Sequence, residues 1–288
     1  MTQQAASGST GSSAAAFKDT IFDLTDQVVV ITGGGGVLGG TIASYLAGHG
    51  ARIAVLDLRE ELAERRAEML RAEGGEAIAF AADVLSRERL VEVRDAILDK
   101  WGRIDALLNA AGGNMPGATV GPDQDLFELS SDDFKKVTDL NLTGSVLPTI
   151  VFAEKMTLNG RGSIINFSSM TAQRAVTRVA GYSAAKGAID SITRWMAAEL
   201  SLRYGEGIRV NAIAPGFFIG DQNRRLLLNE DGSPTERGDK VIRQTPMGRF
   251  GRAEELCGTI HWLLTDASSF VTGVVVPIDG GFSMFSGV

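Results

Sequence analysis

Tyr182 and Lys186 lie four residues apart in a segment predicted to be a helix from Tyr182 to Tyr204. Residues at this spacing project from the same helix face, so the phenol and the ammonium can meet. A free tyrosine titrates near ~10, and a nearby positive charge favours its phenolate form. We therefore expect Lys186 to lower the pKa of Tyr182 and to make the phenol an acid/base group that exchanges a proton with a substrate oxygen.

Ser169 is the third candidate for chemistry. It follows an apolar run, residues 163–168, that predicts a strand, so its hydroxyl is expected at the carboxyl edge of a sheet. A carbonyl held between Ser169 and Tyr182 would be polarised by one hydroxyl and protonated by the other. A tyrosine four residues before a lysine also occurs in solvent-exposed helical pairs without a catalytic function, so this interpretation depends on the motifs that accompany the pair.

A glycine-rich stretch, residues 32–39, separates the apolar run Val28–Ile31 from a predicted helix that ends near His49. Glycines after a buried strand let the backbone approach a pyrophosphate, and the N-terminus of the following helix supplies N–H groups and positive potential. The next predicted strand, Arg52 to Leu56, runs into Asp57. A carboxylate there accepts hydrogen bonds from the adenosine ribose and repels a 2′-phosphate, so the predicted cofactor is NAD.

These motifs together resemble the short-chain dehydrogenase/reductase family. The residues that carry the resemblance are Ser169, Tyr182, Lys186, the glycine-rich turn and the run Asn109-Ala110-Ala111-Gly112, and it extends over residues 22–288. It implies an α/β fold, a single doubly wound (Rossmann) domain with a seven-stranded parallel sheet and helices on both faces. The alternation of short β-branched runs with long helical patterns independently predicts a parallel sheet with crossover helices.

The resemblance also implies roles for individual residues. Asn141 becomes a fourth catalytic candidate, which bends its helix and holds a water leading to Lys186, and Lys186 also holds the nicotinamide ribose. The implied cofactor-binding residues are Gly33, Gly36, Val37, Leu38, Gly39, Asp57, Asp83, Val84, Asn109, Ala110, Ala111, Gly112, Tyr182, Lys186, Pro215, Gly216 and Phe218. Three positions depart from the usual family pattern: Val37 replaces a glycine, Ala110 an asparagine and Gly220 a threonine.

The composition favours a soluble cytoplasmic protein whose partners are small molecules. A net charge of −7 and a pI near 5.0 argue against a surface for nucleic acid or anionic lipid. No run approaches the ~20 apolar residues of a membrane span. Cys257 is the only cysteine, so no intrachain disulfide can form, and no His/Cys/Asp cluster has the spacing of a metal site.

Three segments are expected along the chain. Residues 1–20 are rich in small polar residues and predict a disordered N-terminal arm, or else a start assigned too far upstream. Residues 21–288 form the catalytic domain. Within it, residues 217–250 are polar and only weakly periodic, as expected for a lid over the substrate.

Segments on the substrate side resemble one group within this family, the D-mannonate oxidoreductases, also called fructuronate reductases. These segments are residues 112–119, 215–218, 222–224, 245–251 and 282–288. The resemblance implies reversible NAD-linked interconversion of D-mannonate and D-fructuronate. A hexuronate needs a cation for its carboxylate and amides for its hydroxyls. The candidates are Asn114, Arg178, Asn223 and Arg224, with at least one of the two arginines on the carboxylate.

Other functions remain open at this stage. The substrate is alternatively another sugar acid, a polyol or a 3-hydroxyacyl thioester. A non-catalytic NAD-binding sensor is a candidate from a different class, although a sensor has no need of all four catalytic candidates. The helix that carries Tyr182 has more apolar surface than one sheet covers, and relatives pair such helices, so we expect a homotetramer.

Overall fold

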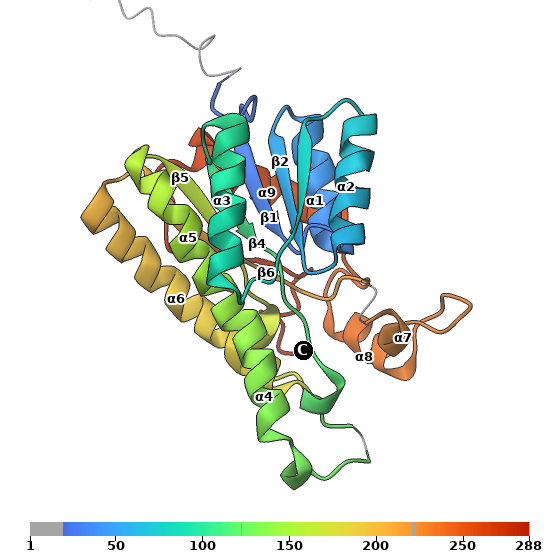
Figure 1. The fold of residues 1–288 in the computed structure, drawn as a ribbon. Helices are drawn as coiled ribbons and strands as arrows, with labels where there is room; N and C mark the ends of the chain where they lie inside the picture. Colours follow the sequence, from blue (N-terminus) through green and yellow to red (C-terminus); the bar gives the residue numbers. More distant parts are fainter. Residues whose placement is uncertain (1–19, 122, 221–222, 288) are drawn as a thin grey trace, which may run out of the picture.

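The computed structural model describes residues 20–121, 123–220 and 223–287 (Figure 1). The predicted arm, residues 1–20, lies outside the described residues except for its last residue.

Seven strands in the described residues form one parallel sheet in the order β3-β2-β1-β4-β5-β6-β7. The strands are β1 (Val28–Thr32), β2 (Arg52–Asp57), β3 (Ala77–Ala81), β4 (Ala106–Asn109), β5 (Gly162–Phe167), β6 (Ile208–Pro215) and β7 (Val275–Ile278). The predicted doubly wound sheet is confirmed. The strand order reverses between β1 and β4, and in such sheets ligands bind at this switch point, outside the carboxyl ends of the strands.

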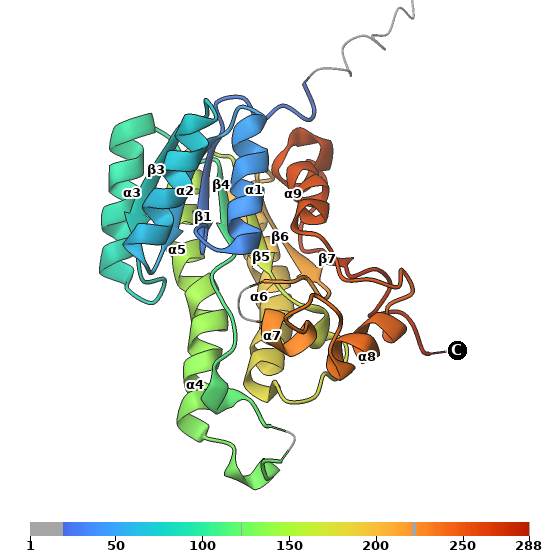
Figure 2. The same ribbon diagram turned by 90° about the vertical axis from the view of Figure 1, so that its right-hand side faces the viewer.

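Helices cover both faces of the sheet (Figures 1 and 2). One face packs against α1 (Val37–Gly48), α2 (Glu60–Ala72) and α9 (Cys257–Leu264), and the other against α3 (Arg87–Trp101), α5 (Gly144–Leu158) and α6 (Ala180–Tyr204). Successive side chains of a strand point to opposite faces, so in β1 Val29 and Ile31 enter the first layer while Val28 and Val30 enter the second. All four are fully buried, which explains why β1 is apolar throughout.

The remaining helices lie beyond the carboxyl edge of the sheet, in the lower part of Figures 1 and 2. They are α4 (Ser131–Thr138), α7 (Arg224–Leu227) and α8 (Glu236–Gln244). Helices α7 and α8 fall inside the predicted lid and contact each other. Short 3-10 segments connect the elements: η1 (Pro116–Ala118), η2 (Leu126–Glu128), η4 (Met170–Ala172), η5 (Ala253–Leu256) and η6 (Asp266–Ser268).

The helical segment that begins at Ser131 has an irregular middle. Helix α4 leads into a π-helical turn, η3 (Asp139–Thr143), and then into α5. Asn141 lies in this irregular turn. Residues 253–264 are divided in a similar way, into η5 and α9.

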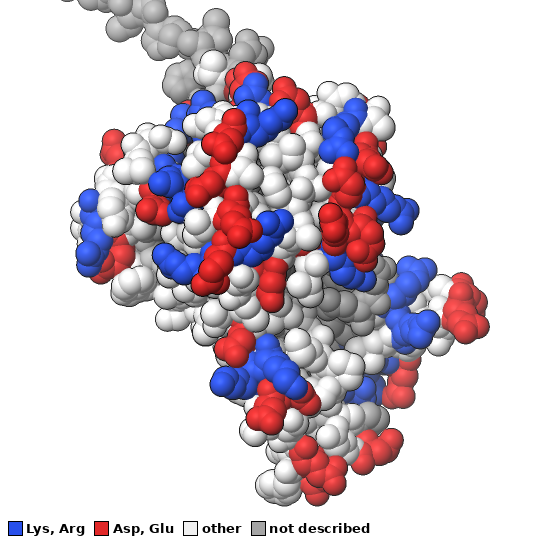
Figure 3. Space-filling model, viewed as in Figure 1, with Lys and Arg blue, Asp and Glu red and all other residues white. Residues whose placement is uncertain are grey.

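Acidic and basic side chains are interspersed on the face shown in Figure 3. Several of them pair along or between turns of one helix, such as Arg71 with Glu64 on α2 and Arg89 with Glu92 on α3. Exposed pairs of this kind typically contribute less than about 1 kcal/mol each to stability.

Candidate active site

Ser169, Tyr182 and Lys186 come together at the carboxyl end of β5. Ser169 is the second residue after β5, and its hydroxyl accepts a hydrogen bond from the Thr171 N–H at 3.2 Å at the start of η4. Tyr182 and Lys186 occupy the first two turns of α6, and the Lys186 Nζ lies 5.4 Å from the centroid of the Tyr182 ring. The Lys186 ammonium donates to the Phe167 carbonyl at 2.6 Å, which attaches the helix to the end of β5.

The pKa of Tyr182 is raised, contrary to the sequence-based expectation. Burial is the main cause, since it removes the hydration of the phenolate, and a hydrogen bond with the Ser169 hydroxyl offsets only part of it. The expected lowering of the Tyr182 pKa by Lys186 is therefore wrong. With its pKa raised above 10, the Tyr182 phenol is neutral at physiological pH.

Lys186 is almost fully buried, with 3% of its surface exposed. Burial lowers its pKa from an ordinary value of 10.5 to about 8, while the negative charge of Asp190 acts in the opposite direction. Asp190 is buried on the next turn of α6, where it accepts a hydrogen bond from the Ser168 hydroxyl. Sequence reasoning did not identify this carboxylate, although its position four residues after Lys186 was a signal for it.

Asn141 is fully buried and holds the loop after β4. Its amide donates to the Gly113 carbonyl at 2.7 Å and to the Val137 carbonyl at 2.8 Å, and its Oδ1 accepts from the Gly113 N–H at 3.0 Å. The Val137 carbonyl is the one that an α-helix pairs with the Asn141 N–H, and this competition accounts for the π-helical turn. A Cβ placed on Gly112 would lie 2.7 Å from the Asn141 Oδ1 and 3.5 Å from the Lys186 Nζ, so these three residues meet. The water expected at Asn141 stays a prediction.

The glycine-rich turn has the shape that a pyrophosphate requires. Gly33 has φ +66°, and a Cβ there would lie 2.9 Å from the Ala111 backbone. A Cβ on Gly39 would lie 2.5 Å from the Gly33 carbonyl oxygen. Gly36 precedes α1, and no side chain caps that helix, so the N–H groups of its first turn face the turn without a competing acceptor. The residues present fit a dinucleotide.

Asp57 lies against this turn. Its Oδ2 accepts from the Gly35 N–H at 3.2 Å, and its Oδ1 accepts from the Arg59 N–H at 3.1 Å. The carboxylate is thereby fixed at the end of β2, the position expected to meet the adenosine ribose. Val37, which replaces the usual glycine, begins α1 and is 38% exposed, so its larger side chain has room.

Among the other implied cofactor-binding residues, Asp83 is exposed, whereas Val84 and Asn109 are buried. The Asp83 carboxylate accepts from the Leu85 N–H at 2.9 Å. The Asn109 amide donates to the Thr149 hydroxyl at 2.9 Å and to the Asn166 side-chain oxygen at 2.8 Å. The Asn109 side-chain nitrogen thus connects β4 to β5 and α5, while its Oδ1 is buried without a hydrogen-bond partner among the described residues. A contact between Asn109 and the cofactor stays a prediction.

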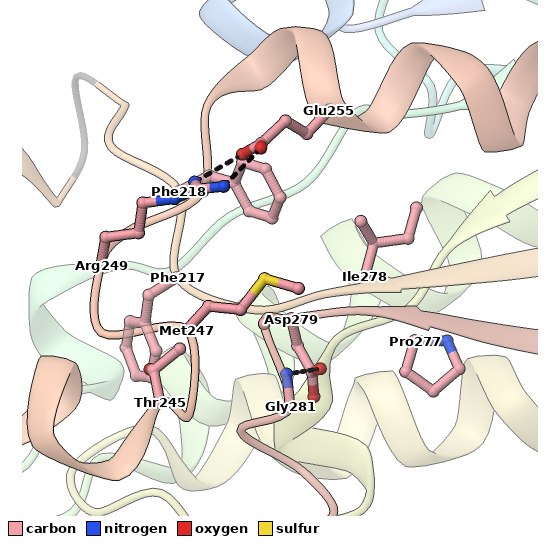
Figure 4. A pocket seen from close by; sticks show the side chains of 12 residues that line it. Phe217, Phe218, Thr245, Met247, Arg249, Glu255, Pro277, Ile278, Asp279 and Gly281 are labelled. Carbon is pink, nitrogen blue, oxygen red and sulfur yellow. Dashed lines mark hydrogen bonds and ion pairs between the residues drawn. The ribbon is translucent and has the colours of Figure 1, made fainter.

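After β6, the Gly216 N–H donates to the Ile278 carbonyl at 2.9 Å, which ties Pro215-Gly216 to the end of β7. The Phe218 ring is buried against Gly251, where a Cβ would lie 2.5 Å from the ring. A cavity of about 370 Å³ lies beside it, and Figure 4 shows its lining residues with the Arg249–Glu255 ion pair at 2.6 Å. None of the four catalytic candidates lines this cavity.

The four candidates for substrate binding differ in how far their polar groups are already engaged in hydrogen bonds. The Asn223 side-chain nitrogen donates to the Phe218 carbonyl at 2.8 Å, and its oxygen accepts from the Gly220 N–H at 2.9 Å. Both contacts lie within its own loop, so Asn223 shapes the lid. Asn114 donates to the Thr119 hydroxyl at 2.7 Å, while its Oδ1 is buried without a partner. Arg224 is exposed at the start of α7, and Arg178 is partly buried in the loop before α6.

Sequence reasoning missed two arginines around this region. Arg174 donates to the Ser283 carbonyl at 2.5 Å and to the Phe285 carbonyl at 3.0 Å, which holds the C-terminal segment against the loop after Ser169. Arg237 extends from α8 toward Thr177. Neither carries a sequence signal, because both belong to irregular or weakly periodic segments.

Comparison with known proteins agrees with this geometry. A family model described as enoyl-(acyl carrier protein) reductase matches residues 36–283. An uncharacterized oxidoreductase, UxuB, from Bacillus subtilis is 43% identical over 275 residues, which cover 92% of this chain and 98% of the relative.

Two solved structures have the same fold. One, named a “putative D-Mannonate oxidoreductase” from Haemophilus influenza and solved with bound NAD, is 44% identical, with a TM-score of 0.85 and coverage of 92% of this chain and 98% of that one. The other is a gluconate 5-dehydrogenase from Burkholderia cenocepacia in complex with NADP and tartrate, 34% identical, with a TM-score of 0.81 and the same coverage.

The chain belongs to the short-chain dehydrogenase/reductase family. It is an oxidoreductase that acts on CH–OH groups with a nicotinamide cofactor. In the described part of the chain, no helix is both long enough and apolar enough to cross a membrane.

Proposed function

We propose that this protein interconverts D-mannonate and D-fructuronate with NAD. The observation that carries this proposal is the 44% identity, over 92% of the chain, to the NAD-bound Haemophilus protein named for D-mannonate. The sequence resemblance in the substrate-side segments supports it, because specificity is set there. A gluconate 5-dehydrogenase at 34% identity makes 5-ketogluconate the nearest competing substrate.

Bound NADH supplies the hydride that reduces the substrate ketone, and NAD takes it back in the reverse direction. Tyr182 donates its proton to the ketone oxygen, since burial raises the pKa of the phenol and keeps it protonated. The Ser169 hydroxyl hydrogen-bonds the same oxygen. Lys186 and Asn141 keep Tyr182 and the loop after β4 in place through their contacts with Phe167 and Gly113.

The substrate is tested with a panel. We expect NADH oxidation with D-fructuronate to have a higher kcat/KM than with 5-ketogluconate or neutral ketoses such as D-fructose. A site built for a carboxylate rejects analogues that lack it, because its buried polar groups are then left unpaired. A neutral ketose with a higher kcat/KM than every ketouronate would overturn the proposed substrate.

The cofactor preference is tested at Asp57. We expect the wild-type enzyme to prefer NADH, and Asp57→Ala to narrow the ratio of kcat/KM for NADH over NADPH roughly 10- to 100-fold, because the carboxylate that repels a 2′-phosphate is gone. Glu61→Ala, which removes an exposed carboxylate from the first turn of α2, should leave the ratio unchanged. Equal kcat/KM values for the two cofactors in the wild type would contradict the NAD assignment.

We further propose that the protein assembles into a homotetramer. Large apolar side chains remain exposed on α5 and α6, among them Ile150, Trp195 and Leu202. Such exposed surface is typical of subunit interfaces. Light scattering at micromolar concentration is expected to give the mass of four chains, whereas a mass of 30.5 kDa would correspond to one.

A further inference from the structure

Arg237 on lid helix α8 reaches the segment that precedes catalytic helix α6. Its guanidinium contacts the Thr177 hydroxyl and carbonyl, both at 3.4 Å, near the upper limit for hydrogen bonds. Its Nε is buried and has no hydrogen-bond partner among the residues that the structure describes. Arg237 is therefore held over Thr177 by weak contacts while part of its hydrogen-bonding capacity remains unused.

Arg178 directly follows Thr177 in the chain. The pKa of Arg237 is lowered, first by burial and then by the positive charge of Arg178, so the two guanidinium groups are close enough to repel each other. In the described part of the chain, neither arginine forms an ion pair with a carboxylate. By contrast, Arg249 in the same lid is paired with Glu255 through two hydrogen bonds of 2.8 and 2.6 Å.

The acidic residue next to Arg237 is already engaged. Glu236 accepts from the Lys240 ammonium at 2.6 Å along the exposed side of α8. Two partly buried like charges without a counter-ion are unfavourable, and an anion between them removes the repulsion and satisfies unused donors.

The backbone at Arg178 is unusual too. Its φ is +81°, in the left-handed region that non-glycine residues rarely adopt. Its carbonyl accepts from the Val120 N–H at 3.0 Å, which fixes this conformation against the loop after β4. Backbone strain of this kind persists where surrounding structure enforces it and is frequent at ligand sites. Three substrate-side segments thus meet at Arg178: the loop after β4, the start of α6 and lid helix α8.

We propose that Arg178 and Arg237 together bind the carboxylate of the sugar-acid substrate, so that the substrate itself ties lid helix α8 to the start of the catalytic helix. This inference rests on the proposed sugar-acid activity and assigns its specificity to a residue that sequence reasoning missed. Guanidinium groups suit this role because their planar donors match the two oxygens of a carboxylate. Arg178 lies in the loop just before α6, four residues ahead of Tyr182 in the chain.

The test compares an acid with its neutral analogue. D-mannonate and D-mannitol, which lacks the carboxylate, are titrated into the NAD-loaded enzyme by calorimetry, and D-fructuronate reduction is measured in parallel. Arg237→Met is expected to weaken D-mannonate binding and to lower kcat/KM for D-fructuronate, each roughly 10- to 100-fold, because a charged hydrogen-bond partner is lost. NAD affinity should stay constant. Arg237→Lys should recover part of the loss, since lysine restores the positive charge but not the paired planar donors of a guanidinium.

Arg243→Met is the matched control, since it removes an exposed arginine from the same helix. Arg178→Met should behave like Arg237→Met. Unchanged D-mannonate affinity in both variants, in an enzyme that reduces D-fructuronate, would overturn the carboxylate site and leave the proposed function standing. A wild-type enzyme that binds D-mannitol as well as D-mannonate would overturn both.

Discussion

Tyr182→Phe is expected to lower kcat for D-fructuronate reduction by about 10²–10⁴, the usual contribution of a positioned general acid or base. Phenylalanine keeps the ring that packs beside Lys186 but has no proton to donate. The hydroxyl of Ser169 can still polarise the ketone, so residual activity remains. NADH affinity, measured by fluorescence titration, should change little, because the substitution removes only the hydroxyl.

Tyr204→Phe provides the control. Tyr204 ends the same helix and is 51% exposed, far from the start of α6. Its loss of a hydroxyl should leave both kcat and NADH affinity unchanged. If Tyr182→Phe retained most of the wild-type kcat, another group would have to donate the proton.

The fold was predictable because the pattern of apolar runs determines it. Val28–Ile31 is apolar on both faces, and a glycine-rich turn follows, so a buried parallel strand ending at a phosphate site was the favoured interpretation. Ser169, Tyr182 and Lys186 were also predictable, since the end of β5 and the start of α6 must meet at the carboxyl edge of the sheet.

The contacts of individual side chains could not be predicted in the same way. Asn109 and Asn223 stand in the expected motifs, yet the amide of Asn109 connects strands and that of Asn223 shapes its own loop. Arg237 shows the opposite case, because nothing in a polar, weakly periodic segment indicates that one of its arginines contacts the loop before α6. The path of the backbone follows from sequence pattern, whereas such contacts depend on packing in three dimensions.

The pKa values of the catalytic pair depend on burial, which the spacing of Tyr182 and Lys186 does not reveal. The sequence argument considered only the attraction between an ammonium and a phenolate. Once both groups are buried, each loses hydration in its charged form, and the pKa of Tyr182 rises while that of Lys186 falls. The consequence for Lys186 can be measured as a dependence of stability on pH.

Lys186→Met is expected to abolish most activity and to change how stability depends on pH. The pKa of Lys186 is about 8 in the folded protein and 10.5 as its ordinary value. The unfolded protein therefore binds this proton more tightly than the folded protein between these two pH values. Through this residue, the unfolding free energy of the wild type should increase by about 3 kcal/mol as pH rises from 8 to 10.5. Below pH 8 it should not change through this residue, because Lys186 stays charged in both states and the penalty for the buried charge is fully present.

The measurement is urea unfolding of wild type and variant between pH 7 and pH 10.5, with the difference in unfolding free energy followed against pH. The difference cancels the titration of the groups that do not interact with Lys186. Whatever the difference is at pH 7, the unfolding free energy of the wild type should increase relative to that of the variant above pH 8. The reason is that Lys186 loses its proton in the folded protein, whereas methionine has no proton to lose. Lys100→Met, on the exposed end of α3, should give a nearly flat difference. A flat difference for Lys186→Met would show that the buried lysine does not titrate near pH 8, and that its role beside Tyr182 requires no depressed pKa.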